Sequence, residues 1–297
     1  MTYPSVHETT YQGSRPGLMV CAVPHGAGEE EFLAAFPEIE QHPDMQSIWP
    51  LFTTYLEIER DVGAGDLAHA IAHHCARLTD VTTLVVDVSY PRGIIDGGRK
   101  MDHCLRGCLP TPLIKQLKPR FLALHQQTLD YTLSLYDRMR AVRTAYLLDV
   151  HTMASFCPVN DGGQKQIFPV SFQLLPSYVD QYLEAHNHAY QRKIDLITAD
   201  DQFQEMGDPR LTQVLQEALT ADGYAWAMND PYQAASAYLS HQHLSQTRAL
   251  SLDVPKHLLA TCAEDLSHYQ LDDVTLDPLR IEAMGRSIAR GLARRWD

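Results

Sequence analysis

The chain has 297 residues, of which 45% are hydrophobic and 21% charged, and its formal net charge is -13. This composition is that of a globular protein and excludes a disordered or fibrous chain. The acidic balance disfavours nucleic acid as a partner, because a phosphate-binding groove would have to form against the mean field of the protein. An anionic substrate would require a local cluster of arginines for the same reason.

The first part of the chain carries no targeting pattern. Residues 1–16 are polar and lack the basic start and apolar run of a secretory signal, and no later stretch is long enough to span a bilayer. We therefore expect a cytoplasmic protein that does not enter a membrane. The absence of a C-x-x-C pair favours reduced, structural cysteines. The six cysteines are Cys21, Cys75, Cys104, Cys108, Cys157 and Cys262.

Short apolar runs alternate along the chain with segments that have apolar residues at helical spacing. In the first half these patterns predict strands over 17–24 and 82–88 and helices over 29–36, 66–78 and 119–140, the last beginning at Pro119. In the second half they predict strands over 145–150, 167–175 and 248–254 and helices over 178–194, 211–220 and 279–296. The polar loop 154–166 is long enough to cover a site.

This alternation predicts an α/β fold in which one mostly parallel sheet is covered by helices on both faces, as a three-layer α/β/α domain over residues 1–297. In such sheets ligands bind outside the carboxyl ends of the strands. The residues that follow predicted strands are His25, Arg92 with Arg99, His151 and Asn229. The sequence therefore predicts a polar site at this edge of the sheet.

Two histidines at the ends of separate strands can bind one metal ion, because neutral imidazole is a common ligand and strand ends are rigid. His25 and His151 have this placement, and Glu59 or Asp61, just before a predicted helix, could supply the carboxylate ligand. A zinc ion with such ligands and one open position lowers the pKa of bound water to about 7. This chemistry is that of amide or ester hydrolysis.

Other polar residues leave alternatives open. Asp149 or Asp87 could orient a ligand histidine through a hydrogen bond. His241 and His243 would lie on one side of an extended segment and are second-rank candidates for metal ligands. Taken singly, a strand-end histidine such as His25 is more often a loop residue that bonds its neighbours, and a glycine-rich loop can simply turn the chain.

Seven short segments, in order and over most of the chain, resemble motifs of the N-formylglutamate amidohydrolase family, which is distantly similar to zinc carboxypeptidases. They are 24–27 (PHGA), 59–63 (ERDVG), 91–99 (PRGIIDGGR), 124–125 (LH), 149–153 (DVHTM), 229–235 (NDPYQAA) and 251–253 (SLD). The resemblance implies a zinc-exopeptidase type of fold and hydrolysis of an amide bond in a small anionic N-acyl amino acid.

The resemblance also implies roles for individual residues. His25, His151 and Asp61 or Glu59 would bind zinc, Arg92 would stabilise the oxyanion, and Asp253 would act as general base. Arg99 would hold a substrate carboxylate in bidentate geometry, and it belongs to a substrate-binding set. The set is Arg99, Asn229, Tyr232 and His125.

The chain departs from the family pattern at several positions. Serines of the family are replaced by Gly26 and Pro91, an asparagine by Gly98, a glycine pair by residues 234–235 (AA), and the closing glutamate by Asp253. Glycine at 98 removes an amide donor, and the shorter side chain of Asp253 retracts the base. These changes leave open a non-catalytic relative that binds a carboxylated ligand or a partner, and a carboxypeptidase-like enzyme that acts on peptides.

Overall fold

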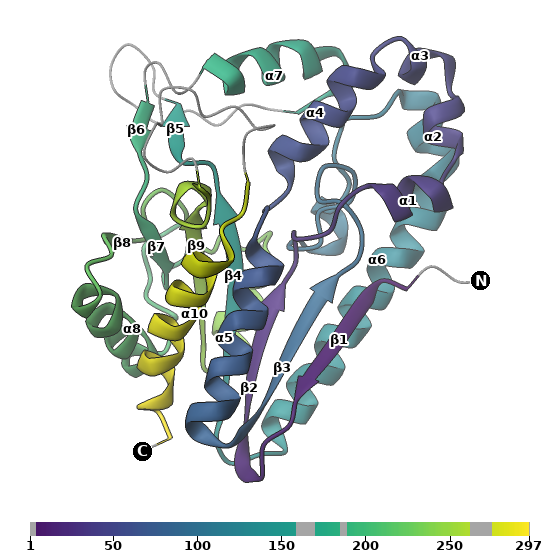
Figure 1. Cartoon of the computed structure of the whole chain (residues 1–297). Helices are drawn as coiled ribbons and strands as arrows, with labels where there is room; N and C mark the ends of the chain where they lie inside the picture. Colours follow the sequence, from purple (N-terminus) through teal and green to yellow (C-terminus); the bar gives the residue numbers. More distant parts are fainter. Residues whose placement is uncertain (1–3, 159–169, 185–188, 262–274, 297) are drawn as a thin grey trace.

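A seven-stranded sheet runs through the centre of the computed structural model, which describes residues 4–158, 170–184, 189–261 and 275–296 (Figure 1). Its strands in spatial order are β1 (Val6–Tyr11), β3 (Val81–Val88), β2 (Arg15–Val23), β4 (Ala145–Met153), β9 (Ala249–Pro255), β7 (Ile194–Ile197) and β8 (Trp226–Met228). The central strands β3, β2, β4 and β9 are parallel, and β7 pairs with β8 in parallel. β1 is antiparallel to β3, and β7 to β9.

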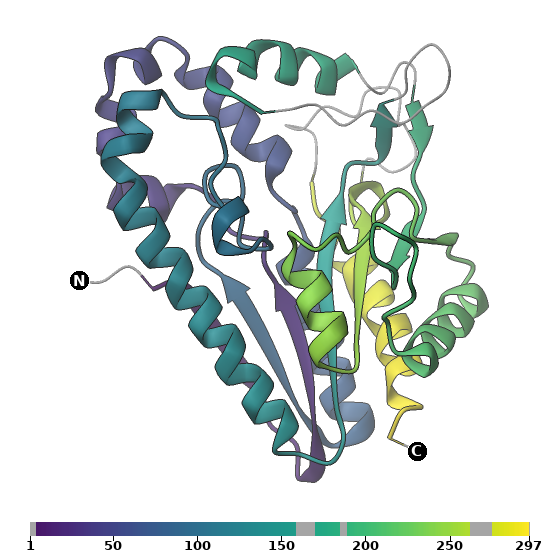
Figure 2. The same cartoon turned by 180° about the vertical axis from the view of Figure 1, so that it is seen from behind.

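Helices cover both faces of this sheet (Figures 1 and 2). One face packs against α5 (Ala64–Thr79), α8 (Pro209–Ala221) and α10 (Pro278–Ala293), and the other against α6 (Thr111–Arg140) and α9 (Leu239–Gln246). Five helices gather beyond the carboxyl ends of the parallel strands. They are α1 (Glu30–Ala35), α2 (Glu38–Gln41), α3 (Pro43–Gln46), α4 (Trp49–Glu59) and α7 (Leu175–Glu184). The predicted three-layer α/β fold with a mostly parallel sheet is confirmed.

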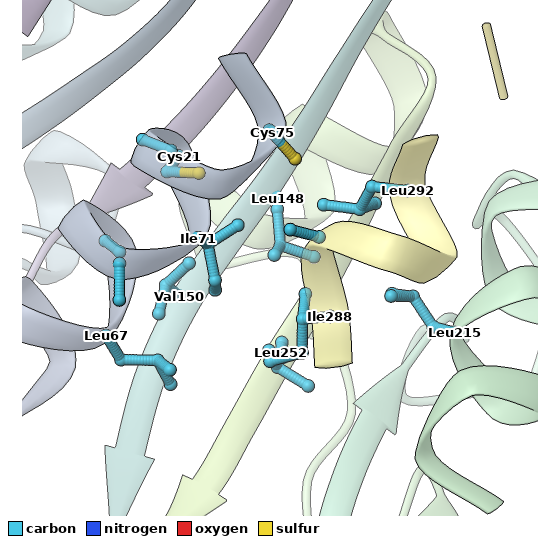
Figure 3. Close-up of a cluster of buried hydrophobic side chains, with 14 of the residues drawn as sticks. Cys21, Leu67, Ile71, Cys75, Leu148, Val150, Leu215, Leu252, Ile288 and Leu292 are labelled. Atoms are coloured by element: carbon cyan, nitrogen blue, oxygen red, sulfur yellow. The ribbon is translucent and has the colours of Figure 1, made fainter. Parts of the chain in front are cut away.

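The parallel strands are buried on both faces, which explains their continuous apolar sequences. Figure 3 shows side chains of β2, β4 and β9 packed against α5, α8 and α10. The residues labelled there are Cys21, Leu67, Ile71, Cys75, Leu148, Val150, Leu215, Leu252, Ile288 and Leu292. Four cysteines are buried free thiols as expected, whereas the Cys157 side chain and Cys262 lie outside the described part of the chain. None of the described helices is long and apolar enough to cross a membrane.

The long helix α6 begins earlier than predicted. It starts at Thr111 instead of Pro119, so Pro119 lies inside the helix. The preceding turns bury Leu113 and Leu117, which are four residues apart on one face of the helix. Packing of this face outweighs the lost backbone hydrogen bond at Pro119.

Two further predictions were wrong, and one strand was not predicted. The segment 170–175 is not a strand, because Phe172–Leu174 forms a 3₁₀ turn that leads into α7; residues 167–169 lie outside the described ranges. In place of the helix predicted over 178–194, α7 ends at Glu184 and Ile194–Ile197 forms strand β7. β1 was missed, because most of its residues are exposed and it lacks an apolar pattern.

A small two-stranded sheet pairs β5 (Phe156–Pro158) with β6 (Ala189–Gln191). β5 lies within the predicted loop 154–166, whose remainder from 159 is outside the described residues.

Candidate metal centre

Three of the predicted residues meet at the carboxyl end of the sheet. His25 lies two residues after β2, His151 lies within the neighbouring parallel strand β4, two residues before its end, and Asp61 lies between α4 and α5. The two Nδ1 atoms of His25 and His151 are 3.2 Å apart. Asp61 Oδ2 is 3.4 Å from the Nδ1 of His25 and 3.1 Å from that of His151.

These three side chains fit a divalent metal ion. Tetrahedral zinc with bonds of about 2.0–2.1 Å holds neighbouring ligand atoms roughly 3.3–3.4 Å apart, close to the separations seen here. Two imidazole nitrogens and one carboxylate oxygen also form a donor set found in catalytic zinc sites. Burial alone would raise the pKa of Asp61, but hydrogen bonds from His151 and His25 hold it well below its usual range, so the carboxylate is ionised. The group could therefore bind a metal.

A buried carboxylate orients each histidine from the opposite side of its ring. The Nε2 of His25 is 2.8 Å from Asp96 Oδ1, and the Nε2 of His151 is 3.1 Å from Asp149 Oδ1. With a metal ion bound, each Nε2–H would donate to its carboxylate, and the Nδ1 lone pair, no longer protonated toward Asp61, would be directed at the ion. Asp149 is one of the two residues considered for this position. The other, Asp87, instead lies 3.7 Å from His69.

The structure separates the two candidate carboxylate ligands. Glu59 Oε2 accepts a hydrogen bond from Arg106 Nη2 at 3.0 Å, and its Oε1 accepts from the hydroxyl of Tyr178. Asp61 instead contacts both histidines. Gly63 has a φ of 85°, a left-handed conformation that lets α5 begin directly after it and fixes the turn that contains Asp61.

Gly98 lies directly against the ring of His25. A Cβ atom at this position would lie 2.7 Å from His25 Nε2 and 2.9 Å from its Cε1, closer than real Cβ contacts. A side chain at 98 would therefore require the imidazole or the loop to shift.

Asp96 is fully buried at the centre of a cluster of arginines. Its Oδ2 lies 2.8 Å from Arg99 Nε, 3.7 Å from Arg106 Nη1 and 4.0 Å from Arg92 Nε. Arg92 Nη1 also donates to Asp61 Oδ1 at 3.2 Å. Burial would raise the pKa of Asp96, but His25 and the arginines hold it well below its usual range. The local cluster of cations that an anionic substrate would require is therefore present.

The candidate metal centre and the arginines around it line a cavity of about 560 Å³, a size suited to a small-molecule ligand. The predicted site residues that line it are His25, Asp61, Arg92, Arg99, His151, Tyr232 and Asp253. Four basic side chains that line the cavity were not predicted as substrate-binding or catalytic residues. They are Arg106, Arg192, His243 and Lys256.

Asp253 lies beside His151, because the two residues are paired in the ladder between β4 and β9. Paired residues project from the same face of a sheet, so both side chains reach the cavity. Asp253 Oδ1 is buried and makes no hydrogen bond within the described part of the structure. Burial, aided by the negative charge of Asp61, raises the pKa of Asp253 to about 7. This carboxyl can therefore exchange a proton near neutral pH.

Two predicted substrate-binding residues are absent from the cavity lining. The Oδ1 of Asn229 accepts hydrogen bonds from the backbone N–H groups of Thr198 and Ala199, at 2.8 and 2.9 Å, and so fixes a turn. His125 is fully buried in α6, with its Nε2 2.9 Å from the Arg99 carbonyl oxygen. Since that oxygen can only accept, Nε2 is the protonated nitrogen. His125 therefore supports the backbone of Arg99.

The expectation of an extended segment at 241–243 was wrong, because both histidines lie in α9. Residues two apart on a helix point in different directions, so His241 and His243 cannot act as a pair. His243 alone is buried and lines the cavity, and its Nδ1 lies 2.6 Å from the hydroxyl of Tyr136.

Of the residues that sequence reasoning missed, Asp96 and Arg106 had the clearest indications. Asp96 stands within the arginine loop between Arg92 and Arg99, and Arg106 follows the same loop. Arg192 lies two residues before β7, within the helix that was predicted over 178–194. Lys256 directly follows β9 and so lies at the expected edge of the sheet. In the sequence, a single positive charge was the only sign that it could belong to the site.

No protein-family model matches the chain, and no curated protein matches its sequence. Among solved structures, it is similar to N-formylglutamate amidohydrolase from Ralstonia eutropha JMP134, with a TM-score of 0.55, 14% sequence identity, and coverage of 97% of this chain and 96% of that one. It is also similar to a gene product from Agrobacterium tumefaciens, with a TM-score of 0.52, 13% identity, and coverage of 99% and 94%. These likenesses show a shared fold over nearly the full length of the compared chains.

Proposed function

We propose that this chain is a metal-dependent amidohydrolase, with residues 1–297 forming one catalytic domain and zinc as the metal. The observation that carries the proposal is the convergence of His25 Nδ1, His151 Nδ1 and Asp61 Oδ2, all within 3.1–3.4 Å of one another, in the wall of a cavity. The fold shared with the N-formylglutamate amidohydrolase from Ralstonia eutropha JMP134 supports the same class of reaction.

Zinc held by these three residues would supply Lewis-acid activation of an amide carbonyl group and of water. Asp253 is placed to take the proton from the attacking water and to return it to the leaving nitrogen. A carboxyl with a pKa of about 7 performs both transfers near neutral pH, because neither its ionised nor its protonated form is rare. The location of Asp253 beside His151 supports this role.

Two arginines have complementary roles in the proposal. Arg92 lies 3.2 Å from Asp61 Oδ1 and would donate to the carbonyl oxygen as it gains negative charge. Arg99 would bind a carboxylate of the substrate. Its guanidinium lies 5.0 Å from the centre of the Tyr238 ring and donates to the Tyr238 hydroxyl at 3.3 Å, which holds its plane in place.

The substrate that this cavity suits best is a small carboxylate-bearing N-acyl amino acid or a related amide. The volume of about 560 Å³ favours a small molecule. The hydroxyl of Tyr232, held by Arg192 Nη1 at 2.9 Å, offers a further polar contact at the cavity wall.

The proposal is tested by measuring metal content and hydrolysis on the same preparations. Wild-type protein is stripped with a chelator, reloaded with zinc, and assayed for amine release from N-formyl and N-acetyl amino acids with acidic or neutral side chains. We expect about one zinc ion per chain and hydrolysis of acidic substrates that is lost with the metal. His151→Ala should lose zinc, whereas His241→Ala, which changes a histidine away from the cavity, should retain it.

Folded wild-type protein that binds no zinc would contradict the proposal. Zinc binding with ligand affinity but no turnover would instead favour a non-catalytic relative. Cleavage of dipeptides in preference to N-acyl amino acids would favour a carboxypeptidase-like enzyme.

A further inference from the structure

Lys256 is a buried lysine in the wall of the cavity. It follows β9 directly, at the start of the 3₁₀ turn Lys256–Leu258, and only 2% of its surface is exposed. Its ammonium donates a hydrogen bond to the carbonyl oxygen of Arg60 at 2.6 Å. Because Arg60 directly precedes Asp61, this bond places the ammonium next to the candidate metal centre.

The contact with Arg60 uses only one of the three hydrogen-bond donors of the ammonium. Among the residues that the structure describes, Lys256 has no other hydrogen-bond partner, and no carboxylate lies within 4.0 Å of it. Burial lowers the pKa of Lys256 to about 8, and attraction to Asp61 and Glu59 opposes this effect, so the group remains mainly protonated at pH 7. A buried positive charge thus retains donors at the surface of the cavity.

Three arginines of the cavity differ from Lys256, because each lies within 4.0 Å of a carboxylate. Arg92 forms an ion pair with Asp61, Arg99 with Asp96, and Arg106 with Glu59. Lys256 also has a structural role at the end of a helix, since Arg60 is the C-cap of α4 and its carbonyl needs a hydrogen-bond donor. One neutral donor would be enough for that role, so it does not explain the positive charge of Lys256.

We propose that Lys256 binds a carboxylate group of the substrate and is a specificity-determining residue, at a position separate from the arginine loop. This inference rests on the proposed function, which supplies the substrate. It adds that Lys256, near Asp61, selects substrates with a negative charge. A carboxylate oxygen would accept from the donors that the Arg60 carbonyl leaves available, and would replace water around a buried cation.

Binding of a carboxylate probe tests this without turnover. Glutarate and its neutral analogue glutaramide are titrated calorimetrically at pH 7 into metal-free wild type, K256Q and K256M. K256Q keeps a donor for the Arg60 carbonyl but has no charge, and K256M removes every donor at similar size. K115Q, at an exposed lysine of α6, is the matched control. Melting temperature and zinc affinity are measured on each protein.

We expect K256Q and K256M to bind glutarate about 10- to 100-fold more weakly than wild type, as loss of a charged hydrogen bond predicts, while glutaramide binding is unchanged. K115Q should match wild type. Equal glutarate binding by wild type and K256Q would overturn the inference, and so would a wild type that shows no measurable glutarate binding. A K256Q protein that loses zinc affinity and glutaramide binding to the same extent as glutarate binding would show a purely structural residue.

The two proposals fail separately. A protein that binds glutarate through Lys256 but hydrolyses no amide refutes the enzymatic proposal alone. Zinc-dependent hydrolysis with unchanged glutarate binding in K256Q refutes the role of Lys256 alone.

Discussion

Replacement of Gly98 by alanine is predicted to weaken metal binding while the fold is retained. The new Cβ would lie 2.7 Å from His25 Nε2, and relief to an ordinary contact of 3.4 Å requires the ring to move by about 0.7 Å. Such a movement disturbs the 2.8 Å contact between that nitrogen and Asp96. Loss of a carboxylate that orients a metal-binding histidine typically costs about 10–100-fold in metal affinity. We expect a decrease of this size in G98A.

The assay is a zinc titration against a competing chelator, with thermal unfolding of the metal-free protein measured in parallel. Overpacking at a crowded site costs about 1–3 kcal/mol of unfolding free energy, so the variant should remain folded. Gly65→Ala is the matched control, because a Cβ there meets only Asp87 Oδ1 at an ordinary 3.6 Å. Zinc affinity in G98A equal to that in wild type and G65A would refute the steric reasoning.

Three other changes have separate outcomes. Asp253→Asn should reduce hydrolysis by about 10²–10⁴-fold, as loss of a general base does, with zinc content unchanged; zinc loss in this variant would show that Asp253 acts as a ligand. Asp96→Asn removes the charge of a fully buried carboxylate that three partly buried arginines share, and should lower the free energy of unfolding by about 3–5 kcal/mol in urea titrations, whereas a change below 1 kcal/mol would contradict the central role of Asp96. Burial lowers the pKa of His257 from 6.5 to about 4. Between these two pH values the unfolded chain binds a proton that the folded chain does not, so stability should fall as the pH decreases from 6.5 to 4. His257→Asn should show a shallower decrease in melting temperature between pH 6.5 and 4, and an unchanged slope would exclude His257 as its source.

The sequence predicted the central strands well, because β2 and β4 contain largely apolar runs buried on both faces and β9 has an alternating pattern. It placed His25 and His151 correctly for the same reason, since both lie at or just after the ends of such strands. It could not rank Glu59 against Asp61. The two carboxylates are two residues apart where α4 ends, and only the positions of Arg106 and Tyr178, from distant segments, show which one is already paired.

Other features depended on contacts that no local pattern reveals. β7 has only four residues, Ile194–Ile197, of which Asp195 is charged, and this length is too short for a strand period and a helix period to be distinguished. Arg192 stands two residues before β7, so its place at the site was not predicted either. Asn229 and His125 match positions of the motifs in the resemblance, yet both bond backbone groups, Asn229 in the turn at Thr198 and His125 at the Arg99 carbonyl. A motif identifies a residue that matters near a site without showing whether it contacts the ligand.

The charge distribution would let an acidic protein accommodate the anionic substrate of the proposed function. The net charge of -13 describes the whole surface, whereas the cavity wall includes five cationic side chains. They are Arg92, Arg99, Arg106, Arg192 and Lys256. At physiological salt, exposed charges are screened over about 8 Å, but buried charges are screened much less. Under the proposed function, these cations would select an anionic substrate after it enters the cavity, and attraction at long range would not be required. Asp96 and Glu59 hold three of them, Arg92, Arg99 and Arg106, in place.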